Sequence, residues 1–404
     1  MKAPTKSIFL TVVILGFVIL TIALTFFTDF EYMTLISKSS YGSYKKIQVT
    51  AAPPPAGSAA AVPRLAYLIA GSKGQLESLW RTVLAVYHPR NQYVLHIDLD
   101  SAVTERMELI QRVEKHPLFS SVGNVHVVKR SNMVTYRGPT MVANTLHACA
   151  ILLNISKDWD WFINLSAADY PLVSQDDILK MFSKVDRNMN FVEHSSNLGW
   201  KEWDRGNPLM IDPGLYSNRK ADVFFTTEKR ELPSQFKLFT GSAWMGLTRE
   251  FVEYCILGID NLPRTLLMYY TNFVSSPEGY FQTVICNSPE FNSTVVNNDL
   301  HYISWPDPPQ QHPAPILTQQ FDVLLASGAP FARKFSSGTR VLDMIDSQLL
   351  GRSNGSVTPG GWCAGVPACS RVGNISSLQL TRGFRRIKKK VRILMKERGE
   401  NMCI

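Results

Sequence analysis

The stretch LAYLIAGSKGQLESLWRTVLAVYHPRNQYVLHIDLD, residues 65–100, holds the pattern that decides the fold. Its first seven residues, LAYLIAG (65–71), form an apolar run ending in glycine, which is typical of a strand buried on both faces. Residues 75–87 predict a helix, because apolar side chains recur there at helical spacing: Leu76, Leu79, Trp80, Val83 and Leu84. YVLHIDLD (93–100) predicts a second strand. Strand, helix and strand in this order indicate a mostly parallel sheet with crossover helices.

The alternation continues along the chain, so we expect one large α/β unit of the nucleotide-binding kind. A helix is predicted over 104–116, a strand over 125–129, a helix over 141–155 and a fourth strand within DWFINLSAADYPL (160–172). Ligands of such sheets bind beyond the carboxyl ends of the strands. One mouth should therefore collect Ala70, Gly71, Asp98, Tyr136, Arg137 and Asp169. No G-x-G-x-x-G or Walker loop follows the first strand, which argues against NAD enzymes and P-loop ATPases.

The N-terminal end predicts a membrane anchor. Residues 7–27 contain no charge and no proline, and they are long enough to cross a bilayer. Lys2 and Lys6 precede them while Asp29 and Glu31 follow, which predicts a cytosolic tail (1–6) and a lumenal remainder, a type II topology. The alternative is a cleaved signal peptide, but its apolar region is shorter and a small-residue cleavage site follows it. Residues 28–63, rich in Ser, Ala, Gly and Pro towards their end, indicate a stem.

The cysteines and sequons suit an oxidising, secretory compartment. Cys363 and Cys369, six residues apart, predict a small disulfide loop, and Cys255 with Cys286 is a second candidate pair. The N-x-S/T sequons begin at Asn154, Asn164, Asn292, Asn354 and Asn374. Asn164 lies in the apolar run WFINLS, so we expect it to be buried and unmodified.

The positive charge belongs to the C-terminal extension (351–404). Residues 382–398 carry nine Lys or Arg against Glu397, a local +8 out of a net +9, so the rest of the chain is close to neutral. This distribution gives no reason to expect a nucleic-acid partner. The segment predicts a solvated basic helix face, or alternatively a surface for acidic lipid or polyanionic glycan.

Several acidic and basic residues are candidates for binding a nucleotide diphosphate. Asp98 and Asp100 form a D-x-D that could hold a divalent cation, but the end of a second strand is also where an acid contacts base or ribose. Asp169 stands alone at the end of the fourth strand, and one carboxylate holds a metal poorly. Arg333 and Lys334 in PFARKF are adjacent cations that could neutralise a diphosphate without a metal, or could be ordinary surface charge.

Two further features of the second half have a plain interpretation and a functional one. Glu278 in SSPEGYFQTVI precedes an apolar helical stretch, so it is either a helix-initiating acid or a general base. An aromatic cluster follows Pro208 and could stack on sugar rings or fill a core: Trp244, Tyr269, Tyr270, Phe273, Tyr280 and Phe281.

Four ordered blocks, WFINLSAADYPL, TGSAWMGLTREFVEY, PEGYFQTVICNS and PFARKF, resemble the core-2/I-branching β-1,6-N-acetylglucosaminyltransferase and peptide O-xylosyltransferase family over about residues 64–350. VNNDLHYISW, PGGWC and the short proline-rich stem are most similar to its plant branch of β-glucuronosyltransferases, which act on the galactan chains of arabinogalactan proteins. The resemblance implies a metal-independent, inverting glycosyltransferase of GT-A fold that uses a UDP-sugar and needs no cofactor. It also implies a Golgi type II membrane protein, alone or in an enzyme complex.

The resemblance further implies roles for individual residues. Glu278 matches the general base, Arg333 and Lys334 match the segment whose lysine meets the donor diphosphate, and Asp98 matches an acid that contacts uridine. Trp244 matches a tryptophan near the acceptor, while His301 stands where relatives place an arginine and is expected to be structural or a weak donor contact. A glucuronate carboxylate would need a basic partner, for which the candidates are Arg137, Lys201, Arg205 and Arg219. Transfer of xylose or N-acetylglucosamine, or glycan binding without catalysis, are the alternatives.

Overall fold

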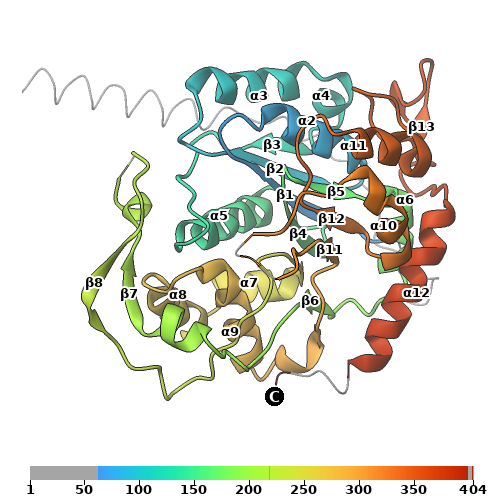
Figure 1. Cartoon of the computed structure of the whole chain (residues 1–404). Coiled ribbons are helices and arrows are strands. Elements are labelled where there is room, and N and C mark those ends of the chain that lie inside the picture. The colour runs from blue at the N-terminus through green and yellow to red at the C-terminus, as the bar shows by residue number, and fades with distance from the viewer. Residues whose placement is uncertain (1–61, 218, 309, 311, 399–402, 404) are drawn as a thin grey trace, which may run out of the picture. The chain divides into compact units, whose positions relative to one another are not determined.

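The computed structural model describes residues 62–217, 219–308, 310, 312–398 and 403 (Figure 1). The predicted tail (1–6), the anchor (7–27) and the stem up to residue 61 lie outside the described residues. Within the described part of the chain, none of the helices has the length and apolar character needed to cross a membrane.

A seven-stranded sheet of order β10-β6-β9-β4-β1-β2-β3 forms the centre of the fold. β1 (Leu65–Gly71) pairs in parallel with β2 (Gln92–Ile97) and β4 (Trp161–Ser166), and β2 pairs in parallel with β3 (Val125–Val127). β9 (Met245–Thr248) runs antiparallel to β4 and β6 (Asn190–Val192), while β10 (Val295–Val296) is parallel to β6. The prediction of a mostly parallel α/β sheet is therefore confirmed.

Helices cover both faces of this sheet (Figure 1), and alternate residues of β1 therefore pack in two different cores. Tyr67 and Ile69 pack with α2 (Leu76–Ala85), α3 (Val103–Lys115), α4 (Pro117–Val122), α6 (Gln175–Phe182) and α12 (Arg382–Glu397). Ala66 and Leu68 pack with α5 (Thr140–Ile155), α7 (Arg249–Leu257), α8 (Leu262–Tyr270) and α9 (Tyr280–Asn287). The continuous apolar run of β1 follows from this two-sided burial.

A second sheet of order β11-β12-β5 lies beside a third apolar core that includes α10 (Phe321–Ser327) and α11 (Arg340–Ile345). β11 (His301–Ile303) is parallel to β12 (Phe331–Arg333), and β12 is antiparallel to β5 (Asp169–Pro171). This antiparallel register places Arg333 directly opposite Asp169.

The remaining elements are short. β7 (Pro208–Ile211) and β8 (Phe224–Lys229) form an antiparallel pair, as do β13 (Cys363–Ala364) and β14 (Arg371–Val372). The single-turn helices are η1 (Glu202–Gly206), η2 (Pro213–Leu215), η3 (Ser276–Glu278), η4 (Asn292–Thr294), η5 (Thr318–Gln320) and η6 (Asp346–Leu350).

The C-terminal extension is anchored by two buried carboxylates at the start of α6. Oδ2 of Asp176 accepts from the backbone N–H of Gly361 (2.8 Å) and of Gln379 (2.6 Å), and Oδ1 of Asp177 accepts from that of Thr381 (2.8 Å). Thr381 in turn caps α12. The apolar face of α12 is buried and most of its cations are exposed, which agrees with the predicted solvated basic helix.

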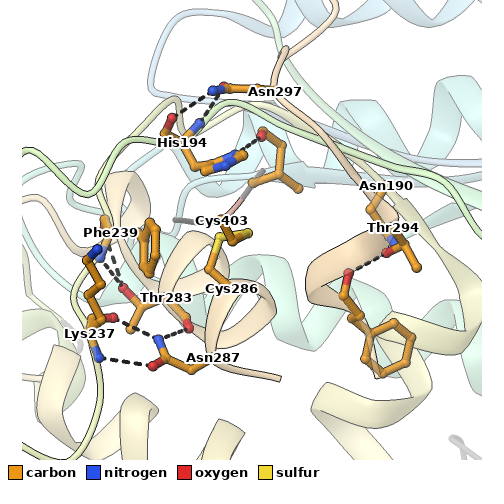
Figure 2. Close-up of a disulfide and its surroundings, with 12 residues drawn as sticks. Asn190, His194, Lys237, Phe239, Thr283, Cys286, Asn287, Thr294, Asn297 and Cys403 are labelled. Atoms are coloured by element: carbon orange, nitrogen blue, oxygen red, sulfur yellow. Dashed lines mark hydrogen bonds between the residues drawn. A yellow bond between two sulfur atoms is a disulfide. The ribbon is translucent and has the colours of Figure 1, made fainter. Parts of the chain in front are cut away.

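One predicted disulfide is confirmed and one is wrong. Cys363 pairs with Cys369, but Cys286 on α9 pairs with Cys403 near the chain end, 117 residues away, as Figure 2 shows. Cys255 keeps a free thiol on α7, close enough to the buried thiol of Cys149 to influence it. Disulfide partners must lie within a few ångströms, and the cysteine that lies beside Cys286 is Cys403, not Cys255.

Asn164 lies in the core as expected. Its side chain is 2% exposed, donates to the carbonyl of Ala243 (2.8 Å) and accepts from the N–H of Met245 (2.9 Å). These bonds join β4 to the segment that leads into β9, so the polar side chain has a structural role there.

Candidate active site

Glu278 ends the short helix η3 and lies against two loops. The N–H of Ser275, three residues earlier, donates to the carbonyl of Arg137 (2.7 Å). The carbonyl of Glu278 accepts from the N–H of Gly241 (2.8 Å). Position 241 accepts only glycine, because the Cβ of any other residue would lie 1.8 Å from the backbone oxygen of Glu193. Backbone packing therefore sets the position of Glu278 before its side chain makes any contact.

Three side chains from two other segments hold the Glu278 carboxylate. Tyr136 Oη donates to Oε1 (2.9 Å), Arg205 Nη1 donates to Oε2 (2.6 Å), and Lys201 Nζ lies 3.6 Å from Oε2. The side chain of Glu278 is 18% exposed, so solvent still reaches it. Burial, together with the Glu278 charge, raises the pKa of Tyr136 far above its usual value, so its hydroxyl remains a hydrogen-bond donor. The carboxylate is accessible and its orientation is fixed, as a general base requires.

A second carboxylate lies close to this group. Desolvation of its carboxyl group, and then the nearby charge of Asp299, raise the pKa of Glu193 to about 7, while Lys201 lowers it and Glu278 raises it. Lys201 also donates to the hydroxyl of Thr240 (2.9 Å). Glu193, Lys201 and Glu278 thus form one electrostatic cluster, in which the charges of Lys201 and Glu278 act on the pKa of Glu193.

Arg333 lies between an acid and an aromatic ring. Its Nε is 3.2 Å from Oδ1 of Asp169, an ion-pair distance without hydrogen-bond alignment, and its guanidinium lies 4.0 Å from the ring centroid of Trp244. Trp244, the predicted acceptor contact, is 4% exposed and forms the floor beneath Arg333. The ring and the carboxylate together orient the guanidinium.

Tyr136 connects the Glu278 cluster with Arg333. Its hydroxyl bonds to Glu278, and the charges of Arg333 and Arg205 both lower its pKa. Arg333 is therefore within electrostatic range of the residue that touches the candidate base. Glu278 and Arg333, which the sequence singled out 55 residues apart, thus act on the same tyrosine, one through a hydrogen bond and the other through its charge.

Two cations of this region, Lys334 and Arg137, pair with none of the carboxylates that the structure describes. In the described residues, no acidic group lies within ion-pair distance of Lys334 or Arg137. Lys334 directly follows Arg333, and its carbonyl accepts from the N–H of Ile316 (2.9 Å). Arg137 is exposed and directly follows Tyr136. Cations without a partner are available to bind an anionic ligand.

The D-x-D acids lie at the carboxyl end of β2, each facing a lysine. Asp98 is buried, and its carboxylate accepts from the N–H of Asp100 (2.9 Å) and of Val134 (3.3 Å). Lys220 Nζ is 3.8 Å from Asp98 and 3.9 Å from Asp100. Burial raises the pKa of Asp98, and the hydrogen bond from Asp100 and the charge of Lys220 oppose that shift. Lys220 therefore offsets the negative charge of Asp98 and Asp100, and Arg333 offsets that of Asp169, the three acids considered as metal ligands.

The aromatic cluster predicted from sequence fills the core, since every member is buried or half-buried: Trp244, Tyr269, Tyr270, Phe273, Tyr280 and Phe281. His301 packs against Phe331 at a ring distance of 5.4 Å, and its Nδ1 lies 2.7 Å from the carbonyl of Asp299, which suits the structural role expected for it. Reasoning from sequence missed Glu193 and the binding of Lys201 and Arg205 to Glu278. Its only signal was the cluster of charged and aromatic residues in WKEWDR (200–205).

A profile of the Core-2/I-branching enzyme family matches residues 65–324. The chain belongs to the Core-2/I-branching enzyme family. It is 57% identical over 337 residues to beta-glucuronosyltransferase GlcAT14B of Arabidopsis thaliana, covering 82% of this chain and 78% of the relative. It is 55% identical over 338 residues to GlcAT14A of the same plant, covering 82% and 76%. Xylosyltransferase 2 of Mus musculus is 30% identical over 312 residues, covering 71% of this chain and 34% of that protein. The chain is thus a glycosyltransferase, as the four sequence blocks indicated.

Proposed function

We propose that this glycosyltransferase moves glucuronic acid, with inversion, from UDP-glucuronic acid to O6 of galactose in the β-1,3/β-1,6-galactan chains of arabinogalactan proteins. The observation that carries the proposal is that Tyr136 bonds to Glu278 and also lies within electrostatic range of Arg333. The plant relatives of the chain are named β-glucuronosyltransferases. Inverting transfer with an anionic leaving group needs an accessible acid to take the proton and a nearby cation to stabilise the leaving group.

In the proposed reaction, Glu278 accepts the proton of the acceptor hydroxyl as its oxygen attacks the anomeric carbon of the donor. The bond from that carbon to the UDP oxygen breaks, and the electron pair leaves with UDP. Arg333 and Lys334 stabilise the diphosphate charge that develops, since charge-assisted contacts to phosphate are strong in a partly buried site. Asp98 binds the uridine side, as expected of a GT-A enzyme. Arg137 pairs with no acid among the described residues and is available to the glucuronate carboxylate.

The donor sugar is tested with a panel of UDP-sugars. The full-length chain, expressed in a host without this activity, is incubated with UDP-glucuronic acid, UDP-xylose or UDP-N-acetylglucosamine and galactan oligosaccharides, and linkage analysis identifies the product. We expect glucuronic acid at O6. Turnover of only UDP-xylose or UDP-N-acetylglucosamine would assign the chain to the alternative transferase. Binding of galactan without turnover of any donor would indicate a glycan-binding protein.

We also propose that no metal takes part. Support comes from the basic neighbours of the three acids considered as metal ligands, Lys220 beside Asp98 and Asp100, and Arg333 beside Asp169. Transfer should therefore continue in excess EDTA. Complete loss of transfer, restored by manganese, would return these aspartates to the role of ligands.

The proposed location is the Golgi membrane, with residues 7–27 as a single-pass type II anchor and the catalytic domain in the lumen. The uncharged 21-residue segment after Lys2 and Lys6 supports this topology. A chain tagged at its C-terminus should be protected from protease in intact Golgi vesicles and cleaved after detergent is added. Cleavage in intact vesicles would contradict the lumenal orientation. Co-purification from the same membranes would test membership of a Golgi enzyme complex.

A further inference from the structure

Three of the eight tryptophans in this chain are exposed, and two of these three are in the same turn. Trp200 is 60% exposed and Trp203 is 69% exposed, whereas Trp159, Trp161, Trp244 and Trp362 are at most 4% exposed. Tryptophan buries a large apolar area in most folded proteins, and an exposed group of aromatic residues marks an interaction surface. Trp200 and Lys201 directly precede η1, which contains Trp203 and Arg205.

Trp200 lies close to the candidate base. Arg205 donates to Oε2 of Glu278 at 2.6 Å, and its guanidinium lies 5.0 Å from the ring centroid of Trp200. The ring centre is thus at most about 9 Å from the carboxylate, because only a C–N bond, a hydrogen bond and one cation–π separation join them. That span is roughly the length of a disaccharide. An acceptor whose hydroxyl reaches Glu278 would therefore place a neighbouring sugar over Trp200.

The chemistry of the surface suits a neutral pyranose chain. A galactose ring carries several C–H groups on one face, and aromatic rings bind such faces through apolar contact and the negative charge of their π-systems. The cations of the turn are already engaged, Arg205 and Lys201 on Glu278 and Arg205 also with Trp200, so the open part of Trp200 presents mainly apolar surface. Trp244, the tryptophan that sequence reasoning proposed for the acceptor, is buried under Arg333.

From this geometry we infer that Trp200 is an acceptor subsite, which stacks on a galactose residue adjacent to the one that is modified. The inference rests on the proposed function and adds to it the residue that selects for an extended galactan over a single galactose. Trp203, also exposed, lies three residues further along the chain.

The test measures steady-state kinetics of the full-length chain with UDP-glucuronic acid and galactan oligosaccharides of increasing length. We expect Trp200→Ala to raise the acceptor KM for oligosaccharides about tenfold, with little change for a galactose monosaccharide. The donor KM and the slow hydrolysis of UDP-glucuronic acid should change less than about twofold. Trp200→Phe should recover most of the oligosaccharide affinity, since a smaller aromatic face remains.

The matched control is Met268→Ala, because Met268 on α8 is also an apolar side chain, 76% exposed, and should leave every parameter unchanged. Wild-type transfer to galactan combined with an unaltered oligosaccharide KM in Trp200→Ala would overturn the inference alone. Equal losses of transfer and of donor hydrolysis would also overturn it, because Trp200 would then act by positioning Arg205. Absence of galactan transfer by the wild-type chain would reject the proposed function and the inference with it.

Discussion

Replacing Glu278 by glutamine is the most direct test of the proposed chemistry, because it keeps the shape of the side chain and removes its basicity. Removing a positioned general base typically lowers the rate by 10²–10⁴-fold. Tyr136, Arg205 and Lys201 hold the carboxylate of Glu278 in one orientation, so we expect a loss in the middle of this range. A thousandfold loss of kcat corresponds to about 4 kcal/mol of transition-state stabilisation.

The structural effect of Glu278→Gln should be smaller. The amide oxygen can still accept from one donor, but the –NH₂ group faces another, and a charge-assisted bond contributes about 1.5–3 kcal/mol. The side chains of Glu278 and Arg205 are 18% and 14% exposed, so solvent screens part of the interaction between their charges. We therefore expect a destabilisation near the lower end of that range.

The assay combines three measurements on wild-type and variant chains: transfer to galactan, affinity for UDP by calorimetry, and the melting temperature. We expect transfer to fall about a thousandfold, UDP affinity to change less than about threefold, and the melting temperature to fall by no more than about 5 °C. Asp204→Asn is the matched control, because Asp204 is an exposed acid in the same turn as Arg205. Retention of more than about a tenth of wild-type transfer would refute the role of Glu278 as base.

Three further predictions concern neighbouring groups. A carboxyl with a pKa of about 7, such as that of Glu193, is neutral below that pH and charged above it. The ionised form should strengthen Glu278 as a base, so kcat should rise through about pH 7 in wild type but not in Glu193→Gln. Identical pH profiles of the two chains would contradict this. Arg333→Ala should lower kcat about a hundredfold and weaken UDP binding. Arg333→Lys should recover part of the activity, because it keeps the charge but loses the planar contact with Trp244. Full activity of the alanine variant would exclude a role of Arg333 in binding phosphate. Cys403→Ser should lower the unfolding free energy by about 2–4 kcal/mol in non-reducing denaturation, because the disulfide to Cys286 closes a loop of 117 residues. Cys255→Ser is the control. An equal effect of both substitutions would argue against the pairing of Cys286 with Cys403.

The local pattern of residues determined the main elements of the fold. The apolar run of LAYLIAG and the helical spacing after it predicted β1 and α2, and the alternation up to residue 172 predicted the parallel part of the sheet. Burial of Asn164 and the disulfide between Cys363 and Cys369 were also predictable. These features depend on neighbours close in the chain, whose periodicity or spacing reports burial directly. The four sequence blocks similarly predicted the family.

Only the tertiary structure decided the contacts of the site. Tyr136, Lys201 and Arg205 contact Glu278 from segments 73 to 142 residues away, and no local periodicity in these short segments reveals such contacts. The matching sequence block pointed to Trp244 as the acceptor contact, but the structure buries Trp244 beneath Arg333 and leaves Trp200 exposed. The same limit explains Cys286, whose partner came from the last residues of the chain. The sequence of a segment indicates which local structure it forms. Which distant side chains contact one carboxylate depends on how the segments pack against each other.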